Sequence, residues 1–122
     1  MTENNYYART FDEFVDILAT NSPHATILEW WRRVDRSIDS YFEEKGIRRP
    51  SRWGESESLL AADPKFWLVG VQLIQELRCV RNRVAHDEIG PLSKEQAEGF
   101  ARSAFRIVGT LVFGAPRLDG RP

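Results

Sequence analysis

Arg81 and His86 are the two side chains of this sequence whose types and spacing best suit chemistry on a phosphate. An imidazole changes its charge between about pH 5 and 8, so a histidine can move a proton to or from a ribose hydroxyl or a leaving oxygen. A guanidinium stays charged and can stabilise charge on phosphate oxygens. RNA carries its own 2′-hydroxyl nucleophile, so this pair suffices for metal-independent cleavage. The alternative is that both residues are structural, with Arg81 tying two helices together and His86 capping backbone carbonyls. The spacing of the two residues, taken by itself, favours this structural interpretation.

The apolar pattern of residues 64–85 places Arg81 on an apolar helix face, near the directions of Ile74, Leu77 and Ala85. Burying an unpaired guanidinium costs several kcal/mol. We therefore expect either a carboxylate partner for Arg81, or a cavity, dimer interface or ligand in front of it.

On a neighbouring face, Arg78, Asn82 and His86 follow one another at intervals of four residues, so Asn82 is placed to orient the imidazole. Arg78 and Arg83 are candidate substrate-binding cations. The C-terminal end of the helix also favours a protonated imidazole at His86.

The rest of the chain predicts a helical bundle that positions this segment. Ser22-Pro23 starts a helix that Gly46 ends, Asp63-Pro64 starts the helix that reaches residue 85, and Ser93 with Gln96 forms a capping box. Two shorter helices are expected, and no alternation of period two predicts a strand. The fold class is therefore all-α, a bundle of four or five helices. The predicted helices span residues 11–19, 23–45, 56–62, 64–85 and 93–113.

The chain divides into a polar N-terminal segment with a short helix (1–22), the bundle (23–113) and a tail (114–122). The short helix is predicted to pack on the bundle or on a partner. Its start is assigned to Thr10 as cap, with Glu13 three residues later.

A basic cluster, Lys45, Arg48, Arg49 and Arg52, lies beside Trp53 in the predicted loop 46–56. One interpretation is an RNA surface with phosphate-binding cations and a stacking aromatic. The other interpretation, which the sequence pattern favours, is a connecting loop whose tryptophan packs into the core.

Composition excludes several classes of protein. The 122 residues suit one domain, and the net charge of −1 argues against coating nucleic acid through bulk positive charge. The single cysteine, Cys79, excludes an intramolecular disulfide and is expected in or near the core. With two histidines, one of them His24 at a helix start, no metal or other cofactor is expected.

No signal peptide or apolar stretch of about 18 residues is present, so we expect a soluble, cytoplasmic protein without membrane association.

The segment 81–86 (Arg-Asn-Arg-Val-Ala-His) resembles the Arg, four to six residues, His motif of the HEPN superfamily (higher eukaryotes and prokaryotes nucleotide-binding). A polar residue after the arginine, here Asn82, is typical of its ribonuclease members. The context is similar too: a long helix, a Gly90-Pro91 turn, and a last helix that begins at 93–97. The similarity covers roughly residues 23–113.

This resemblance implies a homodimer in which two Arg/His motifs meet and cut RNA without metal, leaving a cyclic phosphate. Such proteins act as toxins, in phage defence or in RNA processing, some with an antitoxin or partner protein. In one toxin group a tyrosine that is modified follows the histidine by two positions, where this chain has Glu88. Other members are non-catalytic modules that dimerise or bind a nucleotide or a protein. The function expected is thus a HEPN-type endoribonuclease, with the non-catalytic module as the alternative.

Overall fold

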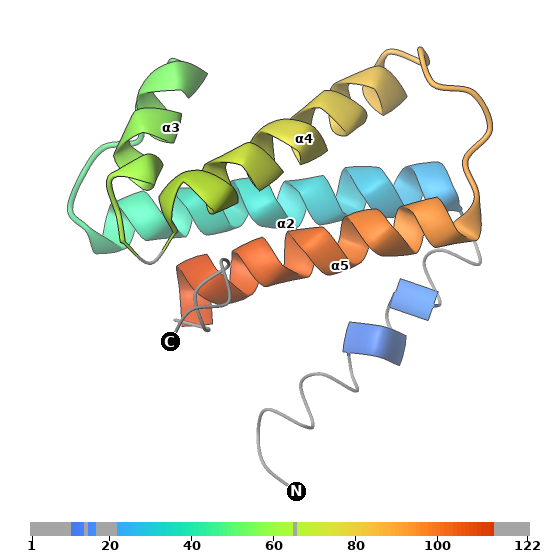
Figure 1. Ribbon diagram of the computed structural model, residues 1–122, viewed down its shortest axis with the longest axis horizontal. Coiled ribbons are helices and arrows are strands. Elements are labelled where there is room, and N and C mark those ends of the chain that lie inside the picture. The colour runs from blue at the N-terminus through green and yellow to red at the C-terminus, as the bar shows by residue number, and fades with distance from the viewer. Residues whose placement is uncertain (1–10, 14, 17–21, 65, 114–122) are drawn as a thin grey trace, which may run out of the picture.

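The structure, a computed structural model, describes residues 11–13, 15–16, 22–64 and 66–113 (Figure 1). Its helices are α2 (Pro23–Glu44), α3 (Trp53–Ala61), α4 (Trp67–Ala85) and α5 (Lys94–Phe113), and residues 11–13 and 15–16 are also helical. None of the described residues lies in a strand. The all-α prediction is confirmed, and no helix in the described part is long and apolar enough to cross a membrane.

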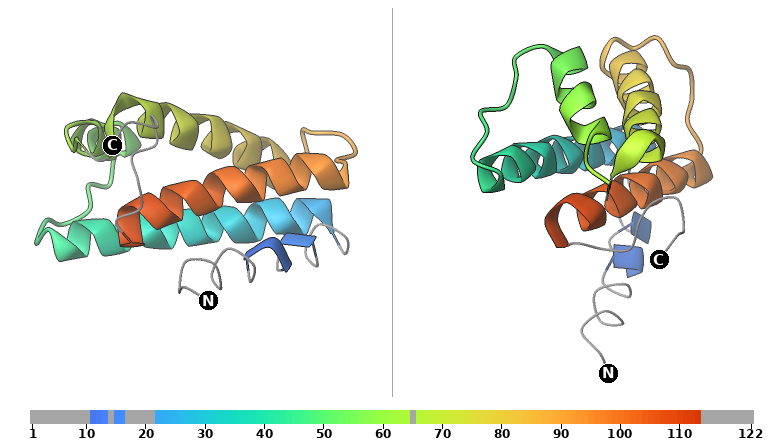
Figure 2. Two further views of the ribbon diagram at one scale, coloured as in Figure 1. Left: turned by 60° about the horizontal axis from the view of Figure 1, so that its bottom comes forward. Right: turned by 60° about the vertical axis from the view of Figure 1, so that its left-hand side comes forward.

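The long helices α2 and α5 lie side by side and run in the same direction, while α4 runs the opposite way across them (Figures 1 and 2). The pair α2 and α5 makes the most extensive helix–helix contact, α4 packs on both, and α3 packs on α4. The core therefore lies where α2, α4 and α5 meet. Its fully buried side chains include Ile27, Val34, Ile38, Phe42, Leu60, Phe66, Ile74 and Ile107.

The helix ends follow the local signals of the sequence. Ser22 accepts a hydrogen bond from the Ala25 backbone N–H at 3.2 Å, with Pro23 in the first helical position. At the start of α5, Ser93 Oγ accepts from the Gln96 N–H at 3.0 Å and Gln96 Oε1 accepts from the Ser93 N–H at 2.8 Å. The predicted capping box is confirmed.

The predicted end of α2 is confirmed as well. Gly46 has φ +70° and its N–H bonds to the Glu43 carbonyl, while the Ile47 N–H bonds to the Phe42 carbonyl. These two bonds define a Schellman motif, in which glycine relieves the cost of the left-handed conformation.

The start predicted for α4 is wrong: the helix begins at Trp67, with Phe66 at its N-cap position. Asp63, Pro64 and Phe66 precede the helix. The Asp63 carboxylate accepts the Tyr41 O–H at 2.5 Å and lies 3.9 Å from Lys45 Nζ. The Asp63 carboxylate therefore ties the segment before α4 to α2.

The helix α3 begins three residues earlier than predicted, at Trp53 instead of Ser56. The Trp53 ring packs against the core, 6.1 Å from the ring of Trp31. This contact fixes the first residue of α3 through tertiary packing, and Gly54 is tolerated in the first turn. The predicted packing of the Trp53 side chain against the core is confirmed, but Trp53 is the first residue of α3 and does not lie in a loop.

The described N-terminal residues dock on the bundle. Phe11 stacks on Phe105 with ring centroids 3.9 Å apart, and its edge meets Trp30 at 5.2 Å. Asp12 Oδ1 accepts from Arg102 Nη1 at 2.8 Å. The described N-terminal residues therefore pack on α2 and α5. Of the two predicted alternatives, packing on the bundle or on a partner, the structure shows the first for these residues. The predicted cap Thr10 and most of residues 14–21, like the tail 114–122, lie outside the described residues.

Arg49 fastens the loop after α2 back onto that helix. Its guanidinium lies 2.8 Å from Asp35 Oδ1 and 2.6 Å from Asp39 Oδ1, and Nη1 also donates to the Asp35 carbonyl at 3.2 Å. Burial opposes the charged form, but the bonds to Asp39 and Asp35 outweigh it and raise the pKa of Arg49. The side chain is 23% exposed, so this network is screened less than a surface ion pair.

We predict that Arg49→Ala lowers the free energy of unfolding by about 1–2 kcal/mol, because two charge-assisted hydrogen bonds are lost while both aspartates stay exposed to water. Urea denaturation followed by circular dichroism measures the change. Arg48→Ala is the matched control: Arg48 is exposed and makes no ion pair among the described residues, so we expect a change within about 0.5 kcal/mol. Equal losses in both variants would contradict this role of Arg49.

Candidate functional site

Arg81 is half-buried on α4, between the buried side chains of Leu77 and Val84. Its Nη1 donates a hydrogen bond to Asn82 Oδ1 at 2.9 Å. Within the described part of the chain, no carboxylate lies in ion-pair distance of this guanidinium. Of the alternatives that the sequence left open for Arg81, a carboxylate partner is thus not supplied by the described residues of this chain.

The Asn82 side chain is hydrogen-bonded to Arg81 and, among the described residues, not to the His86 side chain. Its side-chain oxygen accepts from the guanidinium, and among the described residues no hydrogen bond joins the Asn82 and His86 side chains. Only the backbones of the two residues are bonded, from the His86 N–H to the Asn82 carbonyl at 3.0 Å. The structure therefore gives Asn82 a positioning contact with Arg81, where the sequence predicted one with His86.

His86 is the C-terminal cap of α4, and its side chain is exposed. The next residue, Asp87, has φ +53°, and its N–H donates to the Val84 carbonyl at 3.2 Å. The Glu88 N–H donates to the Arg83 carbonyl at 2.8 Å. This is a second Schellman motif, with aspartate at the left-handed position that glycine usually occupies. It holds the backbone of His86 in a fixed turn while the imidazole faces solvent.

Arg78 and Arg83 are both exposed on α4. The Arg78 guanidinium carbon lies 5.0 Å from the centroid of the Trp53 ring. Among the described residues, neither arginine forms an ion pair, and Asp87 and Glu88 form none with them. The second half of α4 therefore presents three arginines without a carboxylate partner in the described part, followed by an exposed imidazole.

This end of α4 is an open surface. In Figure 1 it stands away from α2 and α5, and Ile89 and Leu92 of the following loop pack against the core. The arrangement suits an extended, anionic ligand that brings its own reactive groups, because the guanidiniums offer hydrogen-bond donors and positive charge. His86 adds the group that can transfer a proton.

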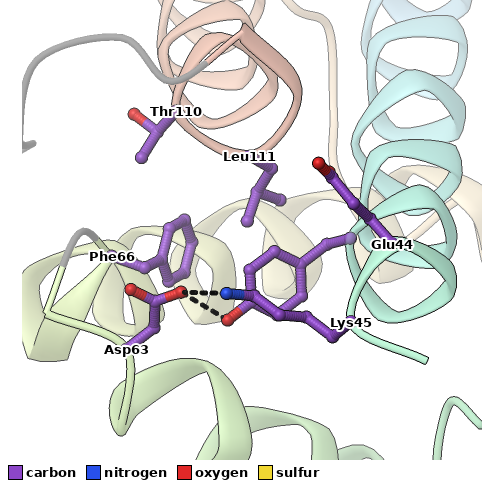
Figure 3. Close-up of a pocket in the computed structure, with 7 residues that line it drawn as sticks. Glu44, Lys45, Asp63, Phe66, Thr110 and Leu111 are labelled. Atoms are coloured by element: carbon purple, nitrogen blue, oxygen red, sulfur yellow. Dashed lines mark hydrogen bonds and ion pairs between the residues drawn. The ribbon is translucent and has the colours of Figure 1, made fainter. Parts of the chain in front are cut away.

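A hollow of about 210 Å³ lies near the other end of α4, between α2, α5 and the turn before α4 (Figure 3). Asp63, Lys45 and Tyr41 line it, with Phe66 and Leu111 as apolar walls. Burial raises the pKa of Tyr41, and the hydrogen bond to Asp63 and the charge of that carboxylate raise it further. The sequence pattern did not indicate this group, because Tyr41 and Asp63 are 22 positions apart and Asp63 lies in a helix-start signal.

Cys79 is exposed on the outer face of α4, so its predicted place in or near the core is wrong. Glu76 and Gln75 on the same helix are exposed as well, which places Cys79 on a polar face. Among the described residues, no three His, Cys, Asp or Glu side chains are grouped as a metal site would require.

Comparisons with protein-family models, with curated proteins and with solved structures find no match to this chain. The function is therefore inferred from the residues and their geometry.

We predict that Asp87→Gly raises the free energy of unfolding by about 0.5–1 kcal/mol, because glycine adopts positive φ without strain and a negative charge leaves the helix C-terminus. Chemical denaturation measures the change.

Two further variants separate these causes. Asp87→Asn removes the charge and keeps a residue that tolerates the left-handed conformation, so it should give only the electrostatic part. Asp87→Ala should be the least stable of the three substitutions. Finding it as stable as Asp87→Gly would show that the backbone of residue 87 is not held at positive φ.

Proposed function

We propose that this protein is a HEPN-type metal-independent endoribonuclease that acts as a homodimer. The observation that carries the proposal is Arg81: a half-buried guanidinium, held by Asn82, without a carboxylate partner among the described residues, on the helix that ends in an exposed His86. A charged group in such a place is stabilised by an anion or by a polar interface that it meets on assembly. The sequence resemblance supplies the class of anion, an RNA phosphate.

In the proposed reaction the RNA 2′-hydroxyl attacks the adjacent phosphorus, and the bond to the 5′-oxygen of the next nucleotide breaks. One His86 accepts the proton of the 2′-hydroxyl, and the His86 of the second subunit donates a proton to the leaving 5′-oxygen. The products are a 2′,3′-cyclic phosphate and a 5′-hydroxyl. Arg81 stabilises the charge that develops on the equatorial phosphate oxygens.

Asn82 and the remaining arginines of α4 have supporting roles. Asn82 positions Arg81 through the 2.9 Å hydrogen bond. Arg78 and Arg83, both exposed, bind phosphates on either side of the scissile bond. The exposed His86 is open to a second subunit, which would complete the site on assembly. Toxin, phage-defence and RNA-processing roles all fit this activity.

The experiment is cleavage of end-labelled single-stranded RNA by the purified protein in the presence of EDTA. We predict that His86→Ala lowers the rate by at least about 100-fold, since proton transfer by a positioned side chain contributes 10²–10⁴-fold. Arg81→Ala should lower it by a similar factor. Mapping the products as cyclic phosphates identifies the 2′-hydroxyl as the nucleophile.

His24→Ala is the matched control, because His24 is the other histidine of the chain and has no part in the proposed site. Circular dichroism and size-exclusion chromatography establish that each variant keeps its helices and its oligomeric state. If the parent protein cleaves a panel of RNAs no faster than His86→Ala, the ribonuclease proposal fails.

The same variants test the alternative, a non-catalytic helical module for dimerisation or partner binding. The hydrogen bond between Arg81 and Asn82 favours this alternative, because the bond gives the guanidinium a partner within its own chain. On this alternative, Arg81→Ala weakens the dimer or the fold, and His86→Ala changes neither.

A further inference from the structure

Trp53 brings together three parts of the molecule that are far apart in the sequence. Its ring lies 6.1 Å from the Trp31 ring of α2, 5.7 Å from the Arg49 guanidinium carbon of the preceding loop, and 5.0 Å from that of Arg78 on α4. The helices α3 and α4 run antiparallel next to each other (Figure 2), so the first residue of α3 meets the second half of α4. Two guanidiniums are therefore held over one indole.

The two guanidiniums differ in what neutralises them. Arg49 is bonded to Asp35 and Asp39. Arg78 has no ion pair among the described residues, and the neighbouring carboxylate of Glu57 accepts a hydrogen bond from Gln75 at 2.9 Å. Of the two guanidiniums at the Trp53 ring, that of Arg78 thus has no carboxylate bonded to it among the described residues and is available to an anionic ligand.

Arg52 is a further exposed cation of the segment that leads into α3. It directly precedes Trp53 in the chain, it is exposed, and it makes no ion pair in the part of the chain that the structure describes. The predicted basic cluster is thus divided by the structure. Arg49 and Lys45 are paired with aspartates, whereas Arg52, directly before Trp53 in the chain, has no such partner among the described residues.

We infer that Trp53, Arg78 and Arg52 form a phosphate-binding subsite for single-stranded RNA, at a distance from the reacting phosphate. The inference rests on the proposed function. Arg78 and His86 are eight residues apart on one helix, which corresponds to about 12 Å along its axis. A strand cut at His86 therefore reaches Arg78 a few nucleotides away from the scissile bond. Trp53 is a positioning residue, since it acts on RNA through Arg78.

The indole restricts the Arg78 side chain before RNA binds. A guanidinium over an aromatic ring is held by cation–π attraction while its N–H groups stay free at the edge. Ordering this side chain in advance removes part of the entropic cost of binding a phosphate. The role of the tryptophan thus differs from base stacking, because its described neighbours are cations and another indole.

The test measures RNA binding in a His86→Ala background, where cleavage is blocked. Fluorescence anisotropy with a labelled single-stranded RNA gives Kd over a range of salt concentrations. Each phosphate contact with a single strand contributes about 0.7 to the slope of log K against log salt. Arg78→Gln should reduce the slope by about 0.7, and Arg78→Gln with Arg52→Gln by about 1.4. Arg32→Gln is the matched control, an exposed arginine paired with Glu29, and should leave the slope unchanged.

The role of Trp53 is tested by ring chemistry. Trp53→Leu should lose the Arg78 contribution to the slope, and Trp53→Phe should keep it, since a benzene ring still holds a guanidinium. Trp53 Nε1 is buried without a hydrogen-bond partner in the described part, so Trp53→Phe removes no hydrogen bond seen there. Melting temperatures identify variants that lose binding only because they unfold.

The outcomes separate this inference from the proposed function. RNA binding that depends on Arg78 and on an aromatic residue at 53, without cleavage by the parent protein, supports the subsite and refutes the ribonuclease. Cleavage with an unchanged salt slope in Arg78→Gln overturns the subsite and leaves the ribonuclease standing. Absence of RNA binding overturns both.

Discussion

Packing of α2 against α5 is the interaction on which the rest of the structure depends. The helix α2 contributes large buried side chains, such as Trp30 and Phe42, whereas α5 contributes three alanines at helical spacing that are completely buried. The small residues, Ala97, Ala101 and Ala104, allow a close approach to a helix rich in aromatic side chains. The helix α4 packs on this pair and α3 packs on α4, so the position of Arg81 and His86 follows from how α4 lies on α2 and α5.

The cluster around Trp53 connects that core to the surface of α4. Trp31 belongs to the core, Trp53 packs on it, and Arg78 lies over Trp53. Arg49 closes the arrangement by holding the loop against Asp35 and Asp39 of α2. A single aromatic side chain therefore sets both where α3 begins and how the first arginine of the α4 surface is oriented.

The parts of the fold that could be predicted from the sequence are those decided by neighbours in the chain. The Ser22 cap, the Ser93–Gln96 capping box and the Gly46 turn involve atoms within a few residues, so residue types at fixed spacing suffice. Predictions failed where distant residues are in contact. The Asp63 carboxylate bonds to Tyr41, 22 positions away, which the local pattern did not indicate, and α4 begins only at Trp67. The aromatic contact between Trp53 and Trp31 likewise starts α3 before its predicted cap.

The candidate site follows the same division. The sequence places Arg81 and His86 on one helix end, but which side chain Asn82 contacts depends on rotamers that spacing does not determine. The left-handed Asp87 was also not indicated, because aspartate marks this conformation far less strongly than glycine. That residue directs the chain away from α4 directly after His86, so the imidazole is the last side chain of the helix and stays exposed. The turn at Asp87 thus leaves the imidazole of His86 exposed to solvent, while the guanidinium of Arg81, five residues earlier, stays half-buried.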